Sequence, residues 1–213
     1  MEHAYGLEIP RTLEEVCHPQ RMALLVYDMQ IGIVGQTLNA KQVAANVISV
    51  VASARKGGFR IFFSRHMSLP NEAAGVSQLR TAMAWQRKDR VGDVKPSFPR
   101  DSPQARIIPE LTPLESEVIF DKLGMSFFVG TPLEMALRDC GIGAVAIAGV
   151  VLEVGIDPTL RHAADLGFLP VLIGDACGSV NENARKRSLD GLSFGGASIV
   201  TDSASICELL ARD

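Results

Sequence analysis

The chain has 213 residues, of which 47% are hydrophobic and 21% are charged. This length suffices for one substantial hydrophobic core and is short for two ordinary domains, so we expect a single domain over residues 1–213. The 21 Lys and Arg residues against 24 Asp and Glu residues give a formal net charge of -3. This balance argues against a nucleic-acid partner, which would need a strong positive field, and favours a small-molecule partner.

No apolar run approaches the roughly 20 residues that a membrane helix needs, and the first residues, MEHAYGLEIP, lack the layout of a secretory signal. We therefore expect a cytoplasmic protein with no membrane partner. The four cysteines are far apart and form no CxxC pair, and no Cys/His cluster has zinc spacing. This pattern indicates neither a disulfide framework nor a metal site, and we expect no cofactor.

Short runs rich in β-branched or aromatic residues alternate with stretches of helical character. In chain order, we expect a strand over 22–27, a helix over 41–56, a strand over 59–64, an irregular segment over 85–113, a strand over 117–120, a helix over 132–140, a strand over 144–148, a helix over 158–166, a strand over 170–173, a helix over 182–192 and a strand over 197–200. This alternation predicts an α/β fold: a three-layer, Rossmann-like sandwich with a six-stranded, mostly parallel sheet.

The irregular segment over 85–113 contains five prolines and the charged cluster Arg87-Lys88-Asp89-Arg90. Irregular segments of this length in compact domains usually serve as lids or interfaces, although a solvated excursion without a role is the alternative. In a doubly wound sheet, ligands bind at the carboxyl ends of the strands. The residues that follow the strands, including Asp28, His66 and Lys122, are therefore expected to converge on one edge.

The chain resembles the isochorismatase-like hydrolases, also called cysteine hydrolases. The resemblance rests on LLVYDMQ (24–30), on the run from PELTPLESEVIFDK to TPLEMAL (109–137), on AIAGVVLEVGIDPTLRHAADLGFLPVLIGDAC (146–177) and on SLDGLSFGGASIVTD (188–202). The order and spacing of these pieces are specific, and together they cover nearly the whole chain. The resemblance implies a catalytic Asp28, a catalytic Lys122 and a nucleophilic cysteine at position 155.

Position 155 is a glycine, so the nucleophile of the cysteine hydrolases is missing. The true isochorismatases, by resemblance, also carry glycine there and hydrolyse an enol ether without a nucleophilic side chain. Asp28 would act as the general acid, which requires burial or a nearby anion to raise its pKa, and Lys122 would be its electrostatic partner. Gly155 would leave room for substrate at a helix N-terminus, with backbone N–H groups directed at an anion. A glycine that records lost catalysis is the alternative.

The resemblance also suggests residues that would bind substrate. Val150 and Val151 occupy the place of a cis peptide in the family, and Leu152 replaces a common threonine. His66 follows the second strand without the Asp-x-His pattern of nicotinamidases, so we expect it to line the pocket and to bind no metal. Aromatic and cationic walls are expected from Phe128, Trp85 and Arg87, with Arg80 and Arg161 as further candidates for carboxylate binding.

The sequence thus predicts a hydrolase of a small, carboxylated metabolite that works without covalent cysteine catalysis. Two alternatives remain open. The first is a C–N hydrolase, acting on an amide or ureide, in which Asp28 activates water. The second is a catalytically silent homologue that binds ligands or forms oligomers. By resemblance, we expect a homodimer or homotetramer.

Overall fold

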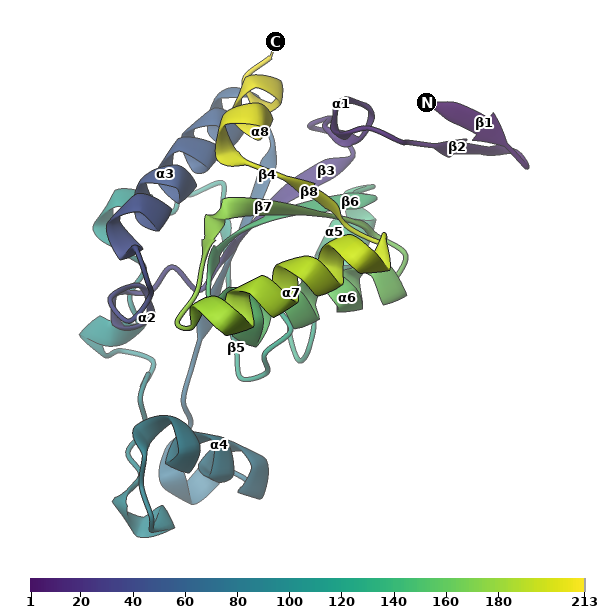
Figure 1. Ribbon diagram of the computed structural model, residues 1–213. Helices are drawn as coiled ribbons and strands as arrows, with labels where there is room; N and C mark the ends of the chain where they lie inside the picture. Colours follow the sequence, from purple (N-terminus) through teal and green to yellow (C-terminus); the bar gives the residue numbers. More distant parts are fainter. Residues whose placement is uncertain (213) are drawn as a thin grey trace.

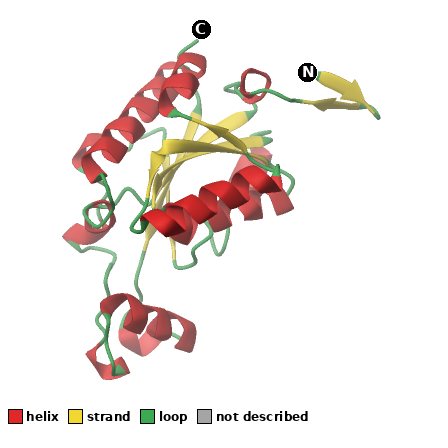
Figure 2. Ribbon diagram, viewed as in Figure 1, coloured by secondary structure: helices red, strands yellow, loops and turns green. Residues whose placement is uncertain are grey.

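Six strands form a single parallel sheet in the order β5-β4-β3-β6-β7-β8. The computed structural model describes residues 1–212, and within them helices cover both faces of this sheet (Figures 1 and 2). The strands are β3 Met22–Tyr27, β4 Arg60–His66, β5 Val118–Lys122, β6 Ala144–Val150, β7 Leu169–Gly178 and β8 Ile199–Thr201. The expected three-layer α/β fold is confirmed, and each expected strand overlaps one of these six.

The chain leaves β3 toward β4 and β5 on one side, and it later builds β6, β7 and β8 on the other side. The order therefore reverses between β3 and β6. In open parallel sheets, such a reversal point opens a crevice at the carboxyl ends of the strands. Asp28 follows β3 directly and Val150 ends β6, so both residues lie at this crevice.

Alternation along β3 divides the core between the two faces of the sheet. Met22, Leu24 and Val26 pack on the face covered by α3 (Ala40–Lys56) and α8 (Ser203–Leu210). The intervening residues of β3, which include Tyr27, pack on the opposite face. That face is covered by α5 (Leu133–Asp139), α6 (Asp157–Asp165) and α7 (Glu182–Gly195). Both faces of β3 are buried because helices cover a parallel sheet on both sides.

The helices that the sequence predicts correspond to α3, α5, α6 and α7, with ends shifted by a few residues. Further elements were not predicted. They are the hairpin β1 (Glu2–Ala4) and β2 (Leu7–Ile9), the helices α1 (Leu13–Val16), α2 (Ile31–Val34), α4 (Val76–Gln86) and α8, the short turns η1 (Asn71–Ala73), η2 (Val91–Asp93), η3 (Pro103–Ala105) and η4 (Pro109–Leu111), and the π-helix η5 (Leu152–Ile156). Across residues 1–212, no helix is both long and apolar enough to cross a membrane.

The segment between β4 and β5 leaves the body of the protein and then returns to it. Figure 1 shows α4 standing away from the sheet, and none of its residues is buried. The second half of the segment lies along the body, where the Ile108 N–H donates to the Met29 carbonyl at 2.9 Å and Ile107 pairs with Gln30. The part expected to be irregular, 85–113, therefore begins in the last turn of α4, and its residues 107 and 108 pair with the residues that follow β3.

Gly149 in β6 permits the close approach of β3 and β6. Its φ is +138°, and a Cβ at this position would collide with the backbone of Tyr27, its partner in the sheet. We predict that Gly149→Ala lowers the free energy of unfolding by about 3 kcal/mol, since it adds backbone strain to a clash with an immobile main chain. Urea unfolding at neutral pH measures this loss. The matched control is Gly143→Ala, where an added Cβ meets nothing within 4 Å; equal losses in the two variants would refute the explanation.

Candidate active site

Asp28 is held in place by its backbone and by Ser64 of β4. Its φ is +47°, in the left-handed region that Asp tolerates better than most residues. The Asp28 N–H donates to Ser64 Oγ at 3.1 Å, and the same hydroxyl donates to Asp28 Oδ1 at 2.6 Å. One side chain on the neighbouring strand thus fixes both the main chain and the carboxylate of Asp28.

Lys122, the last residue of β5, supplies the second partner of this carboxylate. Its Nζ donates to Asp28 Oδ2 at 2.8 Å and to the Gly124 carbonyl at 3.3 Å. The Lys122 side chain is fully buried and that of Asp28 is 6% exposed. Burial lowers the pKa of Lys122 below its usual value, while the neighbouring Asp28 carboxylate opposes this effect. The lowered pKa reduces the free-energy cost of moving a proton from Nζ to Oδ2.

The turn after β6 brings Gly155 toward the same place. The Val150–Val151 peptide is cis, as the resemblance implied, and the π-helix η5 follows it. The N–H groups of residues 154–156 all lie 3.0 to 3.3 Å from the Val151 carbonyl oxygen. This corrects the expectation that backbone N–H groups around Gly155 point at an anion, because the turn uses these donors itself.

Tyr27, which was not predicted as a site residue, fills the space beside Gly155. The Tyr27 hydroxyl donates to the Met125 carbonyl, and the Lys122 Nζ lies 4.3 Å from the ring centroid. Burial raises the pKa of Tyr27 well above its usual value, with the Asp28 charge acting in the same direction. The hydroxyl is therefore neutral at physiological pH.

A cavity of about 400 Å³ opens in front of these groups, and we call it the Asp28 cavity. Its walls include seven of the residues expected at the site, namely Asp28, His66, Trp85, Arg87, Val150, Val151 and Gly155. Tyr27, Gln36, Phe98 and Met125 also line it, although the sequence did not predict them there. Two of these, Gln36 and Phe98, come from segments that have no strand-end position to indicate them.

Three expected site residues do not line the Asp28 cavity. Lys122 lies behind Asp28 and acts on the cavity through residues that line it, including the Asp28 carboxylate to which it donates. Leu152 is fully buried in the core beneath the sheet, and Phe128 stacks on Phe168 at 5.8 Å between ring centroids. The structure therefore corrects the expectation that Leu152 and Phe128 form pocket walls; both side chains are used by the core.

The other two candidate arginines are also absent from the cavity walls. Arg161 pairs with Asp157 on the surface of α6 at 2.6 Å, and Arg80 lies on α4 away from the cavity. Arg87, by contrast, lines the cavity. It follows the last residue of α4 and has a left-handed backbone conformation with φ of +52°. It brings an exposed, permanently charged guanidinium to the wall.

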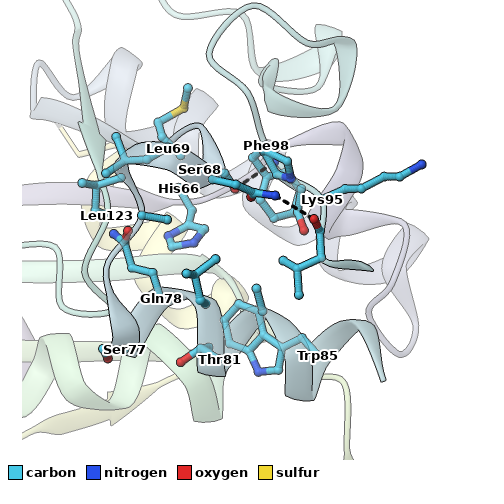
Figure 3. A pocket seen from close by; sticks show the side chains of 18 of the residues that line it. His66, Ser68, Leu69, Ser77, Gln78, Thr81, Trp85, Lys95, Phe98 and Leu123 are labelled. Atoms are coloured by element: carbon cyan, nitrogen blue, oxygen red, sulfur yellow. Dashed lines mark hydrogen bonds between the residues drawn. The ribbon is translucent and has the colours of Figure 1, made fainter. Parts of the chain in front are cut away.

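His66 ends β4 and separates the Asp28 cavity from a neighbouring pocket of about 290 Å³, which we call the α4 pocket. Figure 3 shows the His66 ring pointing into the α4 pocket, with Gln78, Thr81 and Trp85 of α4 around it. The ring centroid lies 6.0 Å from that of Phe98. Burial and then the Lys122 charge lower the pKa of His66 to about 4, so its imidazole is neutral at physiological pH.

Gln30 connects the site to the returning segment. Its fully buried side-chain amide donates to the carbonyls of His66 and Ala105 at 3.0 and 3.1 Å, and it accepts the His66 N–H at 2.6 Å. The sequence signal was the third residue of the Asp-Met-Gln run. This polar side chain lies three residues after a buried strand, a position that indicates a structural hydrogen-bonding role.

Neither metal-ligand clusters nor thiols accompany the Asp28 cavity. Within residues 1–212, no three His, Cys, Asp or Glu side chains gather as a metal ion would require. Cys177 is buried and its Sγ lies 3.6 Å from the Ile147 carbonyl oxygen, and burial raises its thiol pKa to about 12. In place of such groups, the Asp28 carboxylate, the Tyr27 ring and Gly155 form part of the cavity wall.

The chain is thus an α/β protein with a buried acid–lysine pair at the carboxyl ends of the strands of a parallel sheet. The isochorismatase domain model matches residues 22–205, so the chain belongs to the isochorismatase family. The chain is 27% identical over 180 residues to the uncharacterized isochorismatase family protein YecD of Escherichia coli O157:H7, covering 79% of this chain and 85% of that protein.

Two further comparisons extend this assignment. The chain is 28% identical over 178 residues to the ureidoacrylate amidohydrolase RutB of Klebsiella pneumoniae, covering 74% of this chain and 73% of that protein. A crystal structure of a cysteine hydrolase from Pseudomonas syringae pv. phaseolicola superposes with a TM-score of 0.78 at 20% identity, covering 92% of this chain and 94% of that one. At 20% identity, the similarity to this crystal structure concerns the fold alone.

The half-buried His66 makes folding stability depend on pH. Because its pKa falls from 6.5 to about 4 on folding, the unfolded chain binds a proton between these values while the folded chain does not. The neutral His66 therefore contributes to the free energy of unfolding fully above pH 6.5. This contribution, on the order of 3 kcal/mol in total, is lost as the pH falls toward about 4. Urea unfolding from pH 7 to pH 4 should therefore show a shallower pH dependence for His66→Gln than for the wild type. The control is the exposed His3→Gln; identical slopes for all three proteins would exclude this linkage.

Proposed function

We propose that this protein hydrolyses a small, anionic metabolite in the Asp28 cavity without a covalent enzyme intermediate. The observation that carries the proposal is the buried Asp28–Lys122 pair on a cavity wall where position 155 has no side chain. A cavity of about 400 Å³ fits a small metabolite. The membership of the chain in a family of hydrolases supports the same class of reaction.

In the first form of the proposal, the substrate is an enol ether that carries a carboxylate. Asp28 gives a proton to the terminal vinyl carbon, and an oxocarbenium ion forms. Water adds to this ion and returns a proton to Asp28, and the hemiketal then collapses to pyruvate and an alcohol. Lys122 supports the first step, because its lowered pKa reduces the cost of sharing its proton with Asp28 Oδ2.

The cavity walls suit such a substrate. Arg87 supplies a permanent positive charge for a carboxylate, and its planar guanidinium can form two parallel hydrogen bonds to it. The neutral imidazole of His66 and the ring of Trp85 add surface with little charge. Arg87 therefore orients the anion, and the remaining walls favour its apolar part.

A second candidate is C–N bond hydrolysis, and the hydrogen bonds to Asp28 favour it. Ser64 and Lys122 both donate to the carboxylate, and donors of this kind stabilise the charged form. A charged carboxylate accepts a proton from water, which then attacks an amide or ureide carbonyl. The similarity to a ureidoacrylate amidohydrolase supports the same alternative.

Asp28→Asn tests both reactions at once. We predict at least a 100-fold loss of turnover, because proton transfer by a positioned side chain contributes roughly that much. The measurement follows pyruvate and ammonia release in parallel, with isochorismate and a panel of small amides as substrates. Asp28-dependent pyruvate release would support the enol-ether reaction, and Asp28-dependent ammonia release the C–N reaction.

The matched control for this experiment is Asp190→Asn, an identical change at an exposed aspartate of α7. It should retain wild-type turnover. If the wild type releases neither product, or if Asp28→Asn remains fully active, the catalytic proposal fails. Ligand binding without turnover would then point to the catalytically silent homologue.

Arg87 should act on binding more than on the chemical step. We predict that Arg87→Gln raises KM for a carboxylated substrate about tenfold or more and changes kcat little, because a charge-assisted pair contributes about 1.5–3 kcal/mol. Steady-state kinetics separate the two constants. Lys88→Gln removes the adjacent exposed charge, which does not line the Asp28 cavity, and is the control. A large fall in kcat with an unchanged KM would contradict the anchoring role.

A further inference from the structure

The close packing of Tyr27 against Gly155 fixes what position 155 can hold. A Cβ placed on Gly155 would clash with the Tyr27 hydroxyl oxygen and would lie 2.5 Å from Cζ and 2.7 Å from Cε1 of the ring. Real Cβ atoms do not approach other heavy atoms closer than about 3.0 Å. The absence of a side chain at position 155 is therefore a steric requirement of Tyr27, and the two residues form a complementary pair.

We infer that Tyr27 is a specificity-determining residue, whose ring and hydroxyl occupy the volume that a nucleophilic side chain at position 155 would need. As long as Tyr27 is present, the site accepts only glycine at 155 and is restricted to chemistry without a covalent enzyme intermediate. The catalytic consequence rests on the proposed function, whereas the steric exclusion does not.

Tyr27 cannot move aside easily, because its ring is held on several sides. Its side chain is 1% exposed, and its hydroxyl donates to the Met125 carbonyl. Phe127 packs against the ring in an edge-on arrangement at 6.3 Å between centroids. A flexible side chain could yield to a new Cβ, but this ring lies in a close-packed core where a shift would displace its neighbours.

The same ring also contacts the catalytic pair. The Lys122 Nζ lies 4.3 Å from the Tyr27 ring centroid, within the range of a cation–π interaction, while it donates to Asp28 Oδ2. If Tyr27 loses its ring, a cysteine introduced at position 155 can place its thiol in the vacated space, near the buried ammonium group of Lys122. Such a neighbour favours the thiolate and speeds its reaction with an alkylating reagent.

The test is a double-mutant cycle built from Gly155→Cys and Tyr27→Leu. Leucine keeps an apolar side chain in the core but ends short of the Tyr27 Cζ and hydroxyl positions. We expect Gly155→Cys alone to lower the urea midpoint of unfolding sharply. In the Tyr27→Leu background, the same substitution should lower the midpoint by less than half as much.

The second readout is the iodoacetamide alkylation rate at position 155, followed by peptide mass spectrometry so that the native cysteines do not interfere. We expect the introduced thiol to react at least tenfold faster in the double variant than in Gly155→Cys alone. Tyr27→Phe with Gly155→Cys is the matched control, because it retains the ring atoms that lie 2.5 and 2.7 Å from the built Cβ. It should remain as destabilised as Gly155→Cys.

Additive changes in midpoint, or a Gly155→Cys protein as stable as the wild type, would overturn the inference. If Tyr27→Leu does not fold, the comparison of Gly155→Cys with Gly191→Cys decides, because a Cβ at 191 meets only the end of the flexible Arg161 side chain, at 3.1 Å. Equal losses at the two positions would also overturn it. Neither readout uses a substrate, so a failure here is distinct from a failure of the proposed function.

Discussion

The buried pairing of Asp28 with Lys122 is the constraint on which the rest of the site depends. Two charged groups are taken out of water, and each is tolerable only because the other lies 2.8 Å away. Strands β3, β4 and β5 must keep their mutual register to hold them so, with Ser64 between the two from the middle strand. The register of the sheet therefore determines the geometry of the site as well as the stability of the fold, since a shift of one strand would leave a buried charge without its partner.

The strands and their order of appearance could be predicted from the sequence because parallel strands are buried on both faces. A run such as Met22–Tyr27 is apolar throughout, and its end is marked by a charged residue. The same logic located Asp28 and Lys122 at strand ends, while the resemblance supplied their pairing and the importance of Gly155. The order of strands in the sheet, by contrast, depends on contacts distant in the sequence.

The elements that escaped prediction lack a buried face or are very short. Helix α4 has no buried residue, so its sequence carries no strong apolar periodicity to announce a helix. Helix α8 has a clear apolar face, yet it is only eight residues long and follows the last strand closely. The homodimer or homotetramer stays a prediction, although the exposed Val76 and Trp85 of α4 are residues that a second copy could cover.

Tyr27 shows why side-chain roles at the site were harder to infer than strand positions. As the last residue of a buried strand, Tyr27 looks like part of the core, and it does pack there. Its second role, the exclusion of a side chain at position 155, depends on η5, which brings Gly155 against the Tyr27 ring from more than a hundred residues away in the sequence. Leu152 and Phe128 show the reverse error, since residues that flank the site in sequence turn their side chains into the core.

The placement of the four cysteines determines how the site would respond to oxidants. None of them lines the Asp28 cavity, and burial raises the thiol pKa of Cys17 to about 11 and that of Cys177 to about 12, so both thiols are protonated and unreactive at physiological pH. A hydrolase that depends on an active-site thiolate loses activity when peroxide or an electrophile consumes that thiolate. The Asp28 cavity presents no such thiol, so oxidation of a cysteine elsewhere in the protein would remove no group from its wall.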